Sequence, residues 1–101
     1  MRIFNFFGRR KRKVQDFKNR GAVIVDVRSP GEFNSGSIPG SRNIPLEQIQ
    51  SRIKTIQNWK KPVICYCASG MRSAGAASLL RSSGVEAMNG GGISGLMRRL
   101  G

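Results

Sequence analysis

Residues 63–84, VICYCASGMRSAGAASLLRSSG, carry the strongest fold signal in the chain. Together with Pro62, the first five of these residues form the run PVICYC, and residues 62–67 predict a strand buried on both faces of a sheet. A glycine-containing loop follows, and the alanine- and leucine-rich residues 72–84 predict a helix that ends at Gly84. A strand joined to a helix by a short loop is a building unit of parallel α/β sheets.

The rest of the chain repeats this alternation. Further strands are expected at residues 22–27, 42–44 and 85–89. Helices are expected at residues 13–21, at residues 45–59 and after a glycine turn at residues 90–92. Residues 28–45 are dense in Gly, Pro, Ser and Asn and are expected to be mostly loop and turn. We therefore predict an α/β fold with a mostly parallel central sheet flanked by helices.

Composition excludes several classes of site. The 101 residues suffice for a single domain with one modest core. No histidine is present, which excludes catalysis by a histidine base, and two cysteines supply too few ligands for a zinc site. Cys65 and Cys67 are two positions apart, about 6.5–7 Å in an extended strand, which is too far for a relaxed disulfide. We expect reduced thiols, a cytoplasmic location, and neither metal nor cofactor.

Positive charge is concentrated at the N-terminus. The formal net charge is +13, and residues 1–20 carry eight Lys or Arg against one Asp. We expect residues 1–13 to form a basic, partly apolar and partly disordered leader, able to make a weak contact with a membrane surface, and residues 14–101 to form the folded domain. Because no aromatic platform or reading helix accompanies the charge run, a nucleic-acid partner is not expected.

Cys67 stands where the predicted strand ends and the loop CASGMRS begins. Sites in parallel sheets gather at the carboxyl ends of strands. If the loop curls tightly, its backbone N–H groups converge above the sulfur, and with the helix N-terminus they stabilise a thiolate without any histidine. Cys67 is therefore the candidate nucleophile, with a core-filling role as its alternative, whereas Cys65 fits strand packing.

Three segments resemble the rhodanese family in order and spacing. Residues 24–45, IVDVRSPGEFNSGSIPGSRNIP, resemble its signature of Asp-Val-Arg, Glu-Phe, Gly-His-Ile-Pro-Gly-Ala and Asn-Ile-Pro. Residues 64–80, ICYCASGMRSAGAASLL, resemble its catalytic segment Tyr-Cys-x-x-Gly-x-Arg-Ser, and residues 84–93, GVEAMNGGGI, resemble its closing Gly-Gly turn. The resemblance spans roughly residues 14–101.

What the resemblance implies is a single-domain rhodanese-like sulfurtransferase. Family members take sulfane sulfur from a donor such as thiosulfate onto the catalytic cysteine and pass it from the persulfide to a thiophilic acceptor. Cys67 would be the persulfide carrier, and its partner a small anionic sulfur donor or a persulfidated protein. The loop residues, whose backbone amides would hold the outer sulfur, are Ala68, Ser69, Gly70, Met71, Arg72 and Ser73. Arg72 would close the loop and add positive charge. Asp26, Arg28 and Glu32 resemble residues that support the pocket.

The loop length and two departures refine this expectation. Cys67 through Arg72 makes six residues, the size that the family associates with sulfur substrates, whereas phosphatase and arsenate-reducing relatives carry one more. Ser37 occupies the usual His position, and Ile93 and Leu96 stand near a usual Trp. A short last helix would leave one wall of the pocket open or completed by a partner, and a wider mouth would suit a protein persulfide donor better than a small molecule.

A non-catalytic binding or regulatory module is the competing class. The full set of Cys67, Gly70, Arg72 and Ser73 weakens that alternative, because degenerate modules often lose the cysteine.

Overall fold

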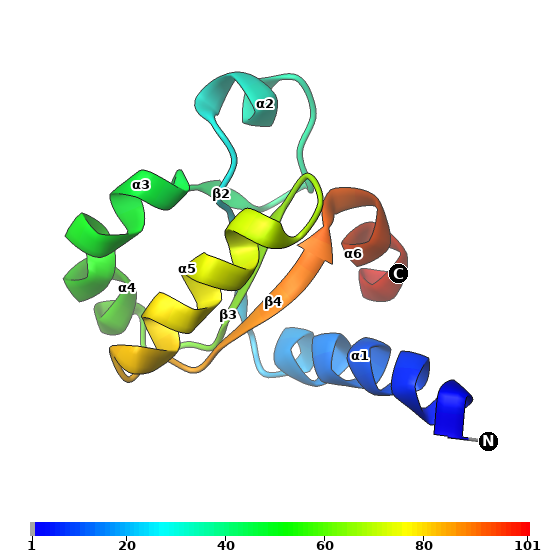
Figure 1. Cartoon of the computed structure of the whole chain (residues 1–101). Helices are drawn as coiled ribbons and strands as arrows, with labels where there is room; N and C mark the ends of the chain where they lie inside the picture. The colour runs from blue at the N-terminus through cyan, green and yellow to red at the C-terminus, as the bar shows by residue number, and fades with distance from the viewer. Residues whose placement is uncertain (1) are drawn as a thin grey trace.

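The computed structural model describes residues 2–101, with side chains from residue 8 onward, and contains one four-stranded sheet (Figure 1). Its strands are β1 (Val23–Asp26), β2 (Arg42–Asn43), β3 (Val63–Cys67) and β4 (Ala87–Gly92). They lie in the order β2-β1-β3-β4, and every neighbouring pair is parallel. The predicted α/β class with a parallel central sheet is confirmed.

Helices cover both faces of the sheet. One face carries α3 (Leu46–Ile49), the 3-10 turn η1 (Gln50–Arg52), α4 (Ile53–Trp59) and α5 (Met71–Ser82). The opposite face carries α1 (Arg2–Asn19) and α6 (Ile93–Leu100). A short helix, α2 (Pro30–Asn34), follows β1 and lies beyond the carboxyl ends of the strands (Figure 1).

The central strand β3 separates two apolar clusters. Val63, Cys65 and Cys67 join the cluster beneath α5, whereas Ile64 and Tyr66 join the cluster beneath α1 and α6. All five residues are buried, which is the physical reason that this strand has no polar alternation in its sequence. The same alternation directs the Cys67 side chain toward the start of α5.

The first helix is longer than the sequence indicated. α1 extends from Arg2 to Asn19, so residues 8–13, which we expected within a partly disordered leader, are helical. Val14 and Phe17 of this helix are buried against the sheet, and the Lys and Arg residues before them continue the helix because their helix propensity is high. The side chains of residues 1–7, which carry the apolar part of the expected membrane contact, lie outside the described residues. Within residues 2–101, no helix combines the length and apolarity needed to cross a bilayer.

Helix α2 was missed, because residues 28–45 were expected to be mostly loop. It is specified locally: the Ser29 hydroxyl accepts a hydrogen bond from Glu32 N at 3.2 Å, and Glu32 Oε1 accepts one from Ser29 N at 3.1 Å. This capping box, with Pro30 in the first turn, is a signal that the sequence contains.

The last strand differs in its bounds from the predicted residues 85–89. β4 starts at Ala87 rather than residue 85, and it continues through the three glycines that we assigned to a turn. Its register with β3 shifts between Cys65 and Tyr66. Glycine is required there, because a Cβ on Gly90 would lie 2.8 Å from Cγ2 of Ile64. Pairing with β3 thus overrides the weak strand preference of glycine.

Candidate active site

Cys67 ends β3 and begins the loop that leads into α5. Its Sγ accepts a hydrogen bond from Gly70 N at 3.0 Å and lies 3.4 Å from Ser73 Oγ. Burial raises the pKa of the thiol, but the Ser73 hydroxyl and the backbone N–H groups of Ser73, Gly70 and Ser69 outweigh it. The net result is a lowered pKa for Cys67, which favours the thiolate as a nucleophile.

Gly70 shapes this loop. Its φ of 97° lies in the left-handed region, and it occupies the N-cap of α5, so the chain turns there and its N–H points at the sulfur. A Cβ at this position would approach Gly91 Cα to 3.1 Å. The loop and the glycine end of β4 are therefore packed backbone against backbone.

Asn89 is a site residue that the sequence reasoning missed. From β4, its Nδ2 donates to Gly70 O at 3.0 Å, and its Oδ1 accepts from Ser73 Oγ at 2.7 Å and from Gly91 N at 2.9 Å. One side chain thus ties the last residue of the loop and the first turn of α5 to β4. No local pattern reveals this role, because Asn89 is 16 positions from Ser73 and meets it only in the folded chain.

Arg72 is engaged by Glu32. Its Nη1 and Nη2 lie 2.8 and 3.0 Å from the two carboxylate oxygens, which is a bidentate ion pair between α5 and α2. We expected Arg72 to close the loop and add positive charge. The pairing fixes the start of α5 against α2, and Glu32 offsets most of the added charge.

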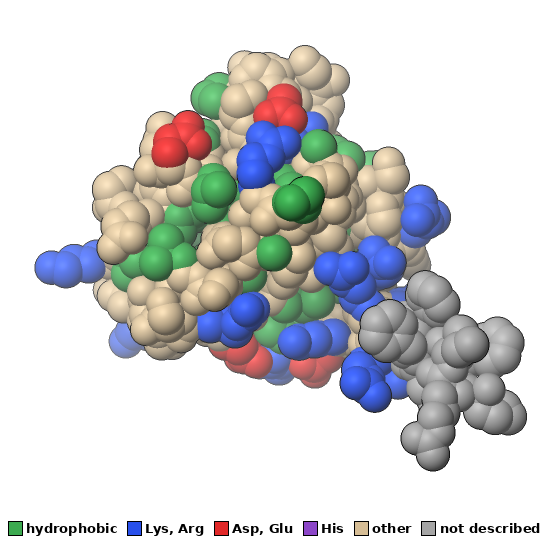
Figure 2. Space-filling view, in the orientation of Figure 1, with side chains coloured by type: hydrophobic (Ala, Val, Ile, Leu, Met, Phe, Trp, Pro, Cys, Tyr) green, Lys and Arg blue, Asp and Glu red, His purple; other side chains and the backbone are tan. Residues whose placement is uncertain are grey.

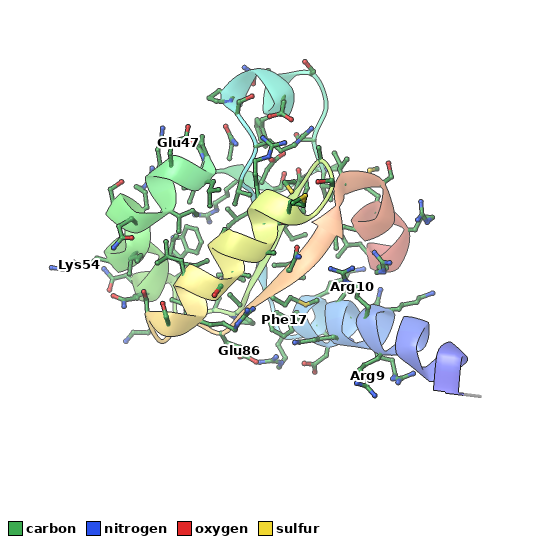
Figure 3. All side chains as sticks on the ribbon, viewed as in Figure 1. Arg9, Arg10, Phe17, Glu47, Lys54 and Glu86 are labelled. Carbon is green, nitrogen blue, oxygen red and sulfur yellow. The ribbon has the colours of Figure 1, made fainter. Side chains whose placement is uncertain are left out.

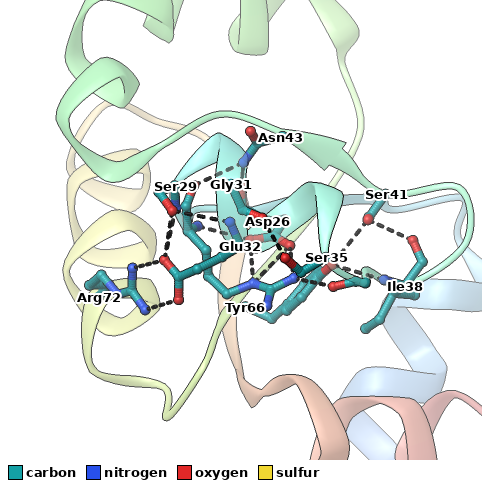
Figure 4. Close-up of polar contacts among 12 residues, drawn as sticks. Asp26, Ser29, Gly31, Glu32, Ser35, Ile38, Ser41, Asn43, Tyr66 and Arg72 are labelled. Carbon is teal, nitrogen blue, oxygen red and sulfur yellow. Dashed lines mark hydrogen bonds and ion pairs between the residues drawn. The ribbon is translucent and has the colours of Figure 1, made fainter.

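Asp26 and Arg28 form a buried pair at the end of β1 (Figure 4). Arg28 Nη2 lies 2.7 Å from Asp26 Oδ2, and the same nitrogen donates to Gly36 O at 2.7 Å. Below them, Tyr66 Oη accepts a hydrogen bond from Ile38 N at 3.0 Å. These contacts hold the segment after α2 in place. The partners of Asp26 and Arg28 are therefore other residues of the protein.

The remaining predicted loop residues lie on the outside. Ala68 and Ser69 are exposed, and Met71 is 82% exposed, which is unusual for a large apolar side chain. Cys67 and Ser73, in contrast, have no exposed surface. Cys65 is also fully buried, and burial raises its pKa to about 12, which makes it a poor nucleophile.

The two departures from the rhodanese pattern occupy different environments. Ser37 is half-buried in the segment braced by Arg28 and Tyr66. Leu96 is fully buried in the cluster beneath α1 and α6, and Ile93 packs against that cluster. In the described part of the chain, no group of three or more His, Cys, Asp or Glu residues is arranged to hold a metal ion.

Known proteins resemble this chain in sequence and in fold. A family model for the rhodanese-like domain matches residues 11–95. Uncharacterized protein YqhL of Bacillus subtilis is 48% identical over 65 residues, or 64% of this chain and 51% of that protein, so the chain spans about half of that relative. Thiosulfate sulfurtransferase GlpE of Pseudoalteromonas translucida is 38% identical over 72 residues, which cover 68% of each protein. A solved structure described as rhodanese with anions from E. coli superposes with a TM-score of 0.69 at 31% identity, covering 74% of this chain and 91% of that one.

Proposed function

This chain belongs to the family of rhodanese-like domains, and we propose that it is a sulfurtransferase that carries sulfane sulfur as a persulfide on Cys67. The observation that carries the proposal is the Cys67 sulfur, held by the Gly70 N–H at 3.0 Å beside Ser73 at the start of α5. Related proteins with sulfurtransferase names support the same reaction class.

The reaction has two steps. The Cys67 thiolate attacks the outer sulfur of thiosulfate, a new S–S bond forms, and sulfite leaves with the electron pair of the broken bond. A thiophilic acceptor then attacks the outer sulfur of the persulfide, and Cys67 leaves as a thiolate. The Cys67 thiolate and the Cys67 persulfide both carry negative charge on sulfur, so the same backbone N–H groups stabilise each of them.

Access to the sulfur requires motion. Cys67 has no exposed surface, whereas Ala68 and Ser69 above it are exposed. We propose that residues 68–70 shift to admit the donor. Both cysteines are free thiols, which fits a reducing, cytoplasmic setting.

Intact mass spectrometry after incubation with thiosulfate tests the proposal. We expect the protein to gain the mass of one sulfur atom, and a reductant to remove it. The Cys67→Ser variant should gain nothing, whereas the matched Cys65→Ala variant should still be loaded. If the unsubstituted protein gains no sulfur in the absence of reductant, the proposal is overturned in favour of a non-catalytic binding module.

A further inference from the structure

Two adjoining hollows connect α1 with the loop after Cys67. The first, of about 510 Å³, is lined by five cations and no acidic residue: Arg9, Arg10, Lys13, Arg81 and Arg99. The second, of about 550 Å³, reaches the loop residues Ser69, Gly70 and Met71. The two share Arg10, Asn89 and Arg99, so they form one surface, which we name the basic groove.

Among the described residues, none of the cations of the basic groove forms an ion pair within 4 Å, although the charge of Lys13 contributes to lowering the pKa of Glu86. The ion pairs in this part of the chain use Arg20, Arg28 and Arg72 instead. Burial lowers the pKa of Arg99, and the charges of Arg10 and Arg98 lower it further. Figure 2 shows Lys and Arg side chains gathered where α1 meets α6. Mutual repulsion of this kind is relieved by a bound anionic partner.

The groove is fixed by tertiary contacts. Gln15 Nε2 donates to Arg99 O at 2.6 Å, and Lys18 Nζ donates to Leu100 O at 2.9 Å, so α1 holds the end of α6. Arg10 lies on the side of α1 that faces α6 (Figure 3), and its Nη2 donates to Asn89 O at 3.1 Å. Asn89 in turn bonds Gly70 and Ser73. Arg10 is thus held beside the active-site loop, and Arg99 lines the same hollow as the loop residues.

We propose that the basic groove binds an acidic segment of the protein that delivers sulfur to Cys67 or accepts it. This inference rests on the proposed sulfurtransferase function. Charge complementarity selects an acidic partner, and the joined hollows offer more length than a small oxyanion needs. Exposed Met71 supplies an adaptable apolar contact at the loop end of the groove. The groove residues named for both hollows include no aromatic side chain, which disfavours base stacking and hence nucleic acid.

Two synthetic peptides of equal length test this proposal. Each carries one central cysteine persulfide, flanked by Glu in one peptide and by Gln in the other. Cys67 attacks the outer sulfur, a new S–S bond forms, and the peptide cysteine leaves as a thiolate. We expect the acidic peptide to load Cys67 about 10-fold faster at low salt, and the preference to fade as salt rises.

A pair of triple variants locates the effect. Arg9→Ala/Arg10→Ala/Lys13→Ala should lose the preference for the acidic peptide while thiosulfate still loads Cys67. The control Lys11→Ala/Arg12→Ala/Lys54→Ala removes the same charge but leaves the groove intact, and it should keep the preference; Lys11 and Arg12 line a different hollow of α1.

The outcomes separate this inference from the proposed function. Equal rates for the two peptides in a protein that thiosulfate loads would overturn the groove inference alone. Failure of every donor to load Cys67 would overturn the proposed function.

Peptides with Ser in place of Cys, and an RNA oligonucleotide of equal length, are compared by fluorescence anisotropy. Tighter binding of RNA, lost in the groove variant, would reassign the partner to nucleic acid and overturn the inference.

Discussion

Ser73 Oγ donates a hydrogen bond to Asn89 Oδ1 at 2.7 Å, while the same oxygen lies 3.4 Å from Cys67 Sγ. A hydroxyl has one proton, so Ser73 cannot donate to both atoms at once. With Cys67 protonated, its S–H can donate to Ser73; with Cys67 ionised, the Ser73 proton can turn to the sulfur. Asn89 Oδ1 keeps a donor in either state, because Gly91 N lies 2.9 Å away.

Removing the Ser73 hydroxyl should raise the pKa of Cys67. The Ser73 side chain is a principal group opposing the effect of burial on this thiol. In Ser73→Ala, the pH profile of alkylation by iodoacetamide should move to higher pH, and the rate at neutral pH should fall roughly 10-fold or more, the value of one hydrogen bond to a charged group. Cys65 stays protonated and does not contribute. Ser78→Ala, on the exposed side of α5, should leave the profile unchanged; a profile that shifts to lower pH would contradict the assignment.

Replacing the Asn89 side chain with an apolar one of similar size should weaken the loop. Asn89→Leu leaves Gly70 O and Ser73 Oγ without their partner on β4. We expect the free energy of unfolding to fall by about 1–3 kcal/mol, and sulfur loading from thiosulfate to slow. Urea unfolding measures the first effect. Asn58→Ala, at an exposed position of α4, is the control; equal midpoints for the two variants would show that the Asn89 contacts contribute nothing.

The Arg72–Glu32 pair should make stability depend on pH in the acid range. The hydrogen bonds from Arg72, followed by those from Ser29, lower the pKa of Glu32 from 4.5 to about 2. A depressed pKa stabilises the folded state above pH 4.5, and this contribution is lost as the pH falls from 4.5 toward 2. Glu32→Gln should therefore be less stable than the unsubstituted protein at neutral pH, and the difference should narrow through that window. Glu47→Gln, at an exposed position of α3, is the matched control variant.

Two glycines close together in the chain should respond in opposite directions to alanine. Gly70 has a φ of 97°, and its Cβ would lie 3.1 Å from Gly91 Cα, so Gly70→Ala should cost about 1–3 kcal/mol and slow sulfur loading. Gly75 is exposed within α5, and outside its chain neighbours and the backbone of its own helix no atom lies within 4 Å of an added Cβ. Gly75→Ala should stabilise the protein by about 0.5–1 kcal/mol. Thermal unfolding compares them, and a stable, active Gly70→Ala would refute the described loop geometry.

Local signals in the sequence determined most of the fold. The apolar runs of β1 and β3 are continuous because both faces of the sheet are covered. The alanine- and leucine-rich pattern that predicts α5 lies within the residues of the helix itself. The position of Cys67 follows from the same signals, since a strand end before a glycine loop is visible in the chain itself. The capping box of Ser29 and Glu32 is equally local, so α2 could have been predicted.

Only the tertiary structure decided the partners of these residues. Asn89 bonds Gly70 and Ser73, Arg72 pairs with Glu32 across 40 positions, and the glycines after Asn89 form a strand because β3 lies beside them. The basic groove likewise joins cations from α1, α5 and α6. Hydrogen bonds and charge clusters depend on distances in space, and a sequence pattern records distances along the chain. The sequence therefore predicted the candidate nucleophile, and the folded chain showed the groups that contact it and the groove beside it.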